Sequence, residues 1–214
     1  MVDADVTYYI TPNPIGALLV LAHGAGAGQR HPFMVSMAGA LAARGVDVAT
    51  FDFPYMQQQR RIPDRAPVLE ASYRDVVAAA MEHEPVRGRR LFIGGKSMGG
   101  RMATHLAAQG VQPLSGVVTL GYPLHPPGKP QQLRAGHLPA ITAPVLMVQG
   151  ERDTFGTPTE LAPVIATMRA TVTLHVVAGG DHSLAVRGKG KDAALPAVAD
   201  IIAEWIRQTE APRH

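Results

Sequence analysis

A serine framed by glycines is the first place in this sequence where covalent chemistry is possible. Residues 95–99 read Gly-Lys-Ser-Met-Gly; they follow the apolar run 91–93 and precede a stretch with helical character, 101–110. This is the strand, sharp turn and helix of the G-x-S-x-G nucleophile elbow, in which the turn leaves no room for a Cβ two residues before or after the serine. We therefore predict that Ser97 is a nucleophile; the alternative is a turn whose glycines serve only close packing.

The Gly-Lys-Ser sequence at 95–97 is also the end of a phosphate-binding loop pattern. That pattern requires a glycine five residues before Gly95, and Arg90 occupies the position instead. The sequence therefore disfavours a phosphate-binding loop.

A serine hydroxyl near pH 7 needs a base beside it, and the chain offers nine histidines. Several lie in or beside expected helices and strands or at the chain end (His31, His83, His105, His175 and His214). His182 differs, because it lies in the glycine-containing loop 178–184 between the last expected strand and the last expected helix. We predict that His182 is the general base.

In folds that carry this elbow, the acid lies between the serine and the histidine in sequence. The expected strand 145–149 leads into Gly-Glu-Arg-Asp at 150–153, and we predict Asp153 as the acid because it lies further from the strand end. Glu151 is the structural competitor. Asp181 is a weaker one, because adjacent side chains on an extended loop point apart.

An oxyanion hole needs one backbone N–H after the nucleophile and one from the loop that follows an early strand. Met98 supplies the first. Residues 23–28 read His-Gly-Ala-Gly-Ala-Gly and form the second loop, where we predict the Ala25 N–H as donor, with Gly26 as the next choice.

The same glycine loop resembles a dinucleotide-binding fingerprint, with Asp52 as a ribose-binding acid. The third glycine of that pattern should fall at position 29, which is Gln29, and His23 has no role in it. Nucleotide binding is therefore kept only as an alternative.

Strand and helix patterns alternate along the chain, which predicts a mostly parallel, doubly wound α/β sheet of about seven strands with an antiparallel N-terminal edge. The first two strands are expected to form a hairpin. Expected strands cover 6–10, 15–22, 46–51, the run from Leu91, 116–120, 144–149 and 171–177, and expected helices cover 31–44, 67–83, the stretch after Ser97, 158–168 and 193–208. Residues 52–67 read as irregular. Ligands of such sheets bind at the carboxyl ends of the strands, where the chemical loops above emerge.

Composition narrows the function. With 214 residues, 46% hydrophobic and 17% charged, the chain is expected to form one domain over 1–214. A net charge of +3 is too small to indicate nucleic acid, and the absence of cysteine excludes thiolate catalysis and cysteine-based zinc sites. The acidic start at Met1–Asp5 does not read as a signal peptide and no apolar run is long enough to span a bilayer, so we expect a cytoplasmic protein without membrane contact.

The walls of the site are expected to come from the segment 53–63 and the proline-rich loop 122–130. No long insertion separates the strands at 116 and 144, which leaves no room for a large lid and favours small, soluble esters. Arg60, Arg61 and Lys96 either receive an acidic substrate or are solvated surface charges. The residues predicted to contact substrate are His23, Gly24, Lys96, Tyr122 and His125; the alternative for Tyr122 and His125 is that they only brace the proline-rich loop.

Four segments carry a family resemblance: Phe-Asp-Phe-Pro-Tyr at 51–55, Gly-Lys-Ser-Met-Gly-Gly-Arg at 95–101, Gly-Tyr-Pro-Leu-His-Pro-Pro-Gly-Lys at 121–129 and Gly-Asp-His-Ser-Leu at 180–184. Together they resemble the α/β-hydrolase superfamily. Within it they resemble the branch of the testis-expressed thirty protein and the hydrolase-like domain of NSL complex subunit three, and more distantly the dienelactone hydrolases.

The resemblance implies the fold more than an activity, because some members of this branch are subunits of chromatin complexes. The residues add the chemistry: we expect a serine hydrolase, carboxylesterase-like, that uses a Ser-His-Asp triad on a small-molecule substrate without metal or cofactor. A catalytically silent interaction domain on the same scaffold is the alternative. The edge strand at Val6 permits a homodimer.

Overall fold

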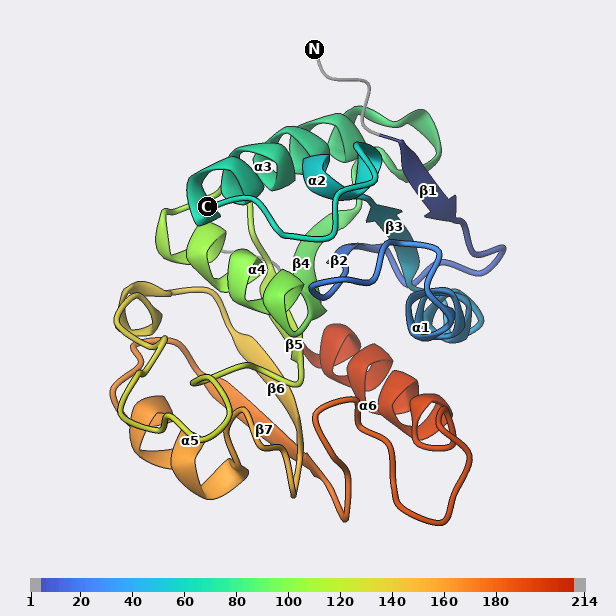
Figure 1. Cartoon of the computed structure of the whole chain (residues 1–214). Helices are drawn as coiled ribbons and strands as arrows, with labels where there is room; N and C mark the ends of the chain where they lie inside the picture. The colour runs from blue at the N-terminus through green and yellow to red at the C-terminus, as the bar shows by residue number, and fades with distance from the viewer. Residues whose placement is uncertain (1–4, 210–214) are drawn as a thin grey trace.

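A seven-stranded sheet forms the centre of the molecule, with the strand order β1-β3-β2-β4-β5-β6-β7 (Figure 1). The computed structural model describes residues 5–209, so residues 1–4 and His214 lie outside the described range. The strands are β1 (Val6–Tyr9), β2 (Ala17–Ala22), β3 (Asp47–Phe51), β4 (Arg90–Lys96), β5 (Gly116–Leu120), β6 (Val145–Gly150) and β7 (Val172–Val177). All pairings except that of β1 are parallel, which confirms the predicted fold class.

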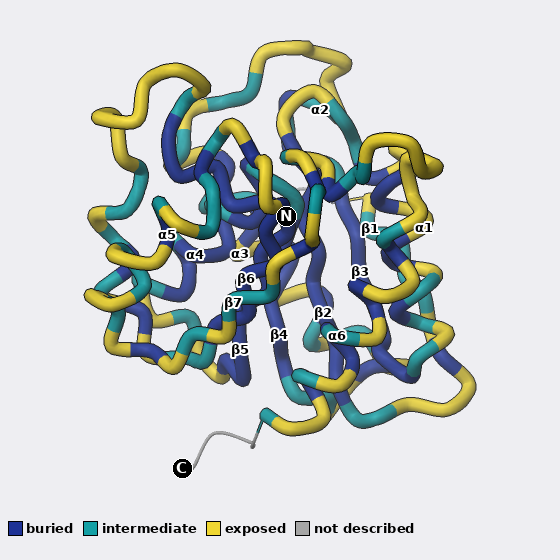
Figure 2. Tube along the Cα trace, turned by 90° about the horizontal axis from the view of Figure 1, so that it is seen from below, coloured by how far each residue is buried: buried dark blue, intermediate teal, exposed yellow. Residues whose placement is uncertain are grey.

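Helices cover both faces of the sheet, as the uninterrupted apolar runs in the strands predict. The helices are α1 (Pro32–Ala42), α2 (Pro54–Gln57), α3 (Ala66–Glu82), α4 (Met98–Ala108), α5 (Pro158–Ile165) and α6 (Leu195–Gln208), with short 3₁₀ turns at Glu84–Val86 and Leu138–Ala140. One apolar core lies between the sheet and α3 and α4, and the other lies under α1 and α6 (Figure 1). Every residue of β2, β3, β5 and β6 is buried, whereas the loops are largely exposed (Figure 2).

The antiparallel N-terminal edge is present, but its partner differs from the one predicted. β1 pairs with β3, with Val6 opposite Phe51 and Tyr9 opposite Val48. The prediction that the first two strands form a hairpin is therefore wrong. The reason is that β2 is hydrogen-bonded to β3 on one side and β4 on the other and has no free edge. The chain turns away after β1, where the Thr11 N–H donates to the buried Asp47 Oδ1 at 2.9 Å.

Two further differences concern the helices. Residues 52–67, expected to be irregular, contain the four-residue helix α2, which begins at Pro54 and buries Tyr55. The helix expected over 158–168 ends at Ile165. Every helix within residues 5–209 falls short of the length and apolar character that a membrane span needs.

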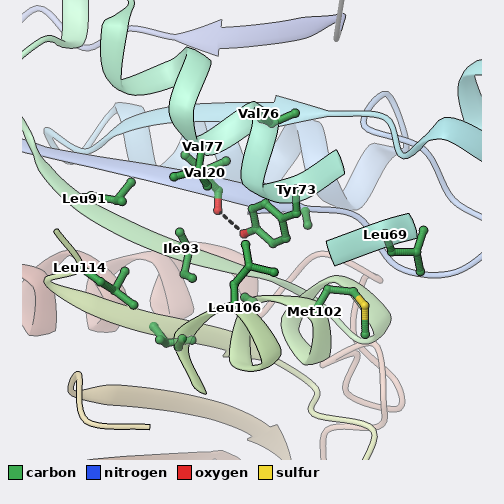
Figure 3. Close-up of a cluster of buried hydrophobic side chains, with 14 of the residues drawn as sticks. Val20, Leu69, Tyr73, Val76, Val77, Leu91, Ile93, Met102, Leu106 and Leu114 are labelled. Carbon is green, nitrogen blue, oxygen red and sulfur yellow. Dashed lines mark hydrogen bonds between the residues drawn. The ribbon is translucent and has the colours of Figure 1, made fainter. Parts of the chain in front are cut away.

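A buried tyrosine joins α3 to the two strands β2 and β4 (Figure 3). The Tyr73 hydroxyl lies 2.7 Å from the Val20 carbonyl oxygen on β2 and 2.6 Å from the Gly94 carbonyl oxygen on β4. It also accepts the Gly94 N–H at 2.9 Å. The side chain is fully buried, so no water can replace these bonds. Burial raises the pKa of the Tyr73 phenol well above its usual range, which keeps the hydroxyl protonated.

Tyr73→Phe is expected to lower the free energy of unfolding by about 1–3 kcal/mol, because buried backbone groups lose their partner while the ring volume is kept. Urea denaturation measures the change. Tyr9→Phe is the matched control, since the Tyr9 hydroxyl takes part in none of the hydrogen bonds described for residues 5–209, and it should change stability by less than about 0.5 kcal/mol. Equal losses in both variants would contradict the bridging role of Tyr73.

Candidate active site

Ser97 occupies a strained turn between β4 and α4. Its φ of 50° and ψ of −114° lie in a region that residues with a Cβ rarely adopt. The surrounding glycines make this turn possible: a Cβ on Gly95 would lie 2.5 Å from the Gly99 carbonyl carbon and 2.6 Å from the Ala22 carbonyl oxygen. A Cβ on Gly99 would overlap the same Ala22 carbonyl. The sequence pattern around Ser97 therefore has a steric cause, as expected.

Three side chains from distant parts of the chain form one hydrogen-bonded series. The Ser97 Oγ lies 2.8 Å from the His182 Nε2, and the His182 Nδ1 lies 2.8 Å from the Asp153 Oδ2. Ser97 follows β4, Asp153 follows β6 and His182 follows β7, so all three lie at the carboxyl edge of the sheet. The geometry is that of a nucleophile, a base and an orienting acid.

The Asp153 carboxylate is completely buried and its orientation is fixed by two further bonds. Its Oδ1 accepts the Phe155 N–H at 2.8 Å, and its Oδ2 accepts from the Gln149 Nε2 at 2.8 Å. These bonds point Oδ2 at His182.

The loop that carries His182 is closed on itself. The Asp181 Oδ1 accepts the Ser183 N–H at 2.7 Å and the Ala185 N–H at 3.0 Å, and Gly180 forms an isolated β-bridge with Val186. Asp181, the weaker rival for the acid, thus stabilises the loop.

Glu151, the other rival, clamps this loop to the end of β6. Its Oε2 accepts the Gly179 N–H at 2.6 Å, and the neighbouring Arg152 donates to the Gly179 carbonyl oxygen at 2.6 Å. The segment 151–153 therefore holds both the backbone of the histidine loop and the imidazole itself.

His182 has two more contacts, one at its ring and one at its backbone. The Phe155 ring stacks on it, with 4.1 Å between ring centroids and an angle of 28° between planes. The Lys96 ammonium donates to the His182 carbonyl oxygen. The stacking restricts the ring to the orientation that faces Ser97, and the Lys96 bond holds the backbone that carries it.

Two backbone amides beside Ser97 have no intramolecular acceptor among the hydrogen bonds of residues 5–209: those of Ala25 and Met98, the two predicted oxyanion donors. Both residues line the same cavity as Ser97.

His23 lies behind the loop 23–28 and is fully buried. Its Nδ1 lies 2.8 Å from the Gly24 carbonyl oxygen, and its Nε2 accepts the Phe53 N–H at 3.1 Å. Burial lowers the pKa of His23, opposed by its bond to Gly24 and the charge of Asp52. His23 thus braces the loop and does not line the cavity.

Asp52, the acid of the dinucleotide alternative, is used inside the protein. Its Oδ1 accepts the Gln29 N–H at 2.6 Å, at the end of the glycine loop. The dinucleotide-binding pattern would instead require this carboxylate to be free to bind ribose.

A cavity of about 870 Å³ opens over Ser97. Its apolar wall includes Phe33 and Met34 of α1, Leu69 of α3 and Phe155. Gly24 and Lys96, predicted to contact substrate, line it as well. Among residues 5–209, no group of three or more His, Asp or Glu side chains is arranged to hold a metal ion.

Tyr122 and His125, the other predicted contacts, lie behind the wall and do not line the cavity; Pro123 does. Tyr122 is fully buried and its hydroxyl donates to the Arg134 carbonyl oxygen at 2.7 Å. His125 is buried with its Nε2 3.2 Å from the Glu160 Oε1. Both residues brace the proline-rich loop.

The cations of the cavity also differ from those considered in the sequence. Arg60 and Arg61 line a separate, smaller hollow, and Arg60 pairs with Asp64 at 2.7 Å. Arg101 and Arg134 line the cavity over Ser97 instead. The position of Arg101 beside Ser97 could have been predicted from the sequence, since it lies four residues after Ser97 on the same helix face. The position of Arg134, in an irregular loop, could not.

Solved structures with the same fold include several hydrolases. The dienelactone hydrolase from Anabaena variabilis is 19% identical, with a TM-score of 0.75 over 95% of this chain and 91% of that chain. Est1E from Butyrivibrio proteoclasticus, bound to ferulic acid, is 15% identical, with a TM-score of 0.77 over 96% and 95%. A monoacylglycerol lipase from Paleococcus ferrophilus is 15% identical, with a TM-score of 0.75 over 97% and 100%.

A family assignment follows from the sequence match itself. The profile of the family described as "Alpha/beta hydrolase domain" matches residues 16–207, which include β2 and every later strand. The strand order, the elbow at Ser97 and the absence of a large lid agree with that match. The chain therefore belongs to the alpha/beta hydrolase domain family.

Proposed function

We propose that this chain is a serine hydrolase that cleaves small ester-type substrates by acyl transfer. The observation that carries the proposal is the series of hydrogen bonds from the Ser97 Oγ through His182 to the buried Asp153, at 2.8 Å each. The esterases and the lipase among the solved structures of the same fold agree with this reaction class.

The reaction proceeds in two halves. His182 Nε2 takes the proton from Ser97 as the Oγ attacks the carbonyl carbon, while Asp153 accepts the Nδ1–H and stabilises the imidazolium. The imidazolium then protonates the leaving alcohol, and an acyl-serine remains. Water, deprotonated by the same imidazole, releases the acid and restores Ser97.

The carbonyl oxygen gains negative charge in both halves and needs donors that are in place beforehand. The free amides of Ala25 and Met98 supply them, with Met98 at the positive N-terminal end of α4. His23 keeps the first of these amides in position by bonding Gly24 and Phe53. Each donor of this kind contributes about 2.7–4 kcal/mol to transition-state stabilisation.

The size of the cavity favours small substrates. A volume of about 870 Å³ lies within the range of small-molecule sites, and the exposed rim has no large lid that would shelter a long acyl chain. The narrower relationship to the testis-expressed thirty and NSL branch stays a prediction from the four sequence segments.

Ser97→Ala is expected to reduce kcat on p-nitrophenyl acetate by about 10⁶-fold and to abolish labelling by a fluorophosphonate probe, because the nucleophile is gone. Ser183→Ala, a serine on the wall of the same cavity, is the matched control and should keep both. Ester hydrolysis by Ser97→Ala at the wild-type rate would contradict the proposal.

Asp153→Asn is expected to lower kcat by about 10⁴-fold, since an amide at this place favours the wrong imidazole tautomer. Glu151→Gln should stay close to wild type, because its amide oxygen can still accept the Gly179 N–H. Steady-state kinetics on the same ester compare the two variants. A larger loss in Glu151→Gln would move the role of the acid to Glu151.

Lys96 adds a dependence on pH. Burial lowers the pKa of Lys96 to about 8, with the charges of Asp153 and Asp181 opposing the shift. The unfolded chain holds the proton until about pH 10.4. Between these values the unfolded state binds more protons, so stability rises with pH.

Wild type should therefore gain stability relative to Lys96→Met as the pH rises from about 8 to about 10, whereas below pH 8 the difference is constant. Urea denaturation of both proteins at pH 7.5 and pH 9.5 measures this. A difference in unfolding free energy that does not change between the two pH values would show that Lys96 is not desolvated.

A further inference from the structure

Two arginine side chains share the cavity with Ser97. Arg101 lies on α4, and its N–H donates to the Ser97 carbonyl oxygen at 3.0 Å, so the two residues are one helical turn apart. Helical side chains lean toward the N-terminus of their helix, which here is the end that carries Ser97. Arg134 reaches the same cavity from the loop between β5 and the 3₁₀ turn at Leu138.

Neither guanidinium has a partner within residues 5–209. No salt bridge or hydrogen bond of this range includes the guanidinium group of Arg101 or Arg134, and the Arg101 Nε is buried without an acceptor. Other partly buried arginines of the protein are paired: Arg89 with Asp47 at 2.9 Å and Arg44 with Asp200 at 2.6 Å. Two partly buried positive charges side by side are costly unless an anion joins them.

The carboxylate whose charge acts on Arg101 is already hydrogen-bonded elsewhere. Glu70, whose charge acts on Arg101, has its Oε1 2.9 Å from the His105 Nδ1 and accepts from the Gln109 side chain at its Oε2, 2.7 Å away. Asp64, on the wall of the cavity, accepts from Arg60 through its Oδ1, and its Oδ2 is buried without a partner within residues 5–209; it forms no salt bridge with either arginine of the pair. Burial, followed by the charge of Arg134, lowers the pKa of Arg101. Within residues 5–209, no carboxylate forms a salt bridge with either guanidinium of this pair.

The backbone around Arg134 is fixed relative to the catalytic residues. The Arg134 N–H donates to the Leu124 carbonyl oxygen at 2.7 Å, and its own carbonyl oxygen accepts the Tyr122 hydroxyl. The Tyr122 N–H in turn donates to the Gln149 Oε1 at 2.8 Å, and the Gln149 Nε2 contacts Asp153. This series of hydrogen bonds fixes the position of the Arg134 backbone relative to Asp153.

We propose that Arg101 and Arg134 bind a carboxylate on the substrate, so that the preferred substrates are short esters that carry a second, free carboxylate. The planar guanidinium donors match a carboxylate with two parallel hydrogen bonds, and the charge of the ligand relieves the repulsion between the two arginines. This inference rests on the proposed function, because it names the substrate class of the same site.

The kinetic test compares an anionic ester with a neutral one of the same shape. Monoethyl glutarate and ethyl 5-oxohexanoate place the anion on the acyl side, and 4-(butanoyloxy)butanoate and 4-oxopentyl butanoate place it on the alcohol side. In wild type, kcat/KM for the anionic ester should exceed that for the neutral ester at least tenfold in one of the two pairs, chiefly through KM. In Arg101→Gln and Arg134→Gln this ratio should fall toward one, whereas Arg169→Gln, an exposed arginine, should keep it.

A binding test separates this inference from the proposed function. Calorimetry with Ser97→Ala protein should detect binding of monoethyl glutarate or 4-(butanoyloxy)butanoate. The additional Arg134→Gln substitution should weaken that binding at least tenfold. Ser97-dependent turnover without preference for either anionic ester would overturn the inference and leave the proposed function intact. Binding that depends on Arg134 without any ester turnover would support the anion site and overturn the hydrolase. Tighter binding of inorganic phosphate than of either carboxylate would also overturn the inference.

Discussion

The contact between the first turn of α4 and the end of β2 is so close that it excludes even a single methyl group. The backbone around the Ala22 carbonyl occupies the space that a Cβ on Gly95 or Gly99 would need. Because the helix cannot move away without opening the core beneath it, the intervening serine is forced to a φ of 50°. The exposure of the Ser97 hydroxyl and its position beside two free amides both follow from this contact. The strain at one residue is thus maintained by packing around its neighbours.

The end of β6 organises the remainder of the site. Residues 149–153 contact the proline-rich loop through Gln149, the histidine loop through Glu151 and Arg152, and the imidazole through Asp153. Five consecutive residues thereby set the positions of two separate loops. Such an arrangement keeps the site stiff, because each loop is bound either to the buried strand β6 or to the turn that directly follows it.

The sequence predicted the fold and the candidates for the triad because these depend on local rules. Glycine spacing around Ser97, apolar strands without alternation and the chain order of serine, acid and histidine are all readable along the chain. Strand partners and side-chain directions that depend on residues distant in sequence could not be predicted in this way. β1 pairs with β3 because β2 has no free edge, and Tyr122 is buried because its hydroxyl finds the Arg134 carbonyl. Polar residues in irregular loops have no period, so their direction is unreadable before folding.

The closed loop around His182 also determines where an additional segment can be inserted into the fold. Its bridge between Gly180 and Val186 isolates the imidazole from the chain that follows, and residues 187–193 then run mostly exposed past the mouth of the cavity, where Lys191 and Asp192 lie on the rim. Lengthening an exposed loop costs little conformational entropy. An inserted segment between Arg187 and Asp192 would therefore lie over the cavity while His182 kept its place. A cap can therefore be added at this position without a change in the hydrogen bonds among Ser97, His182 and Asp153.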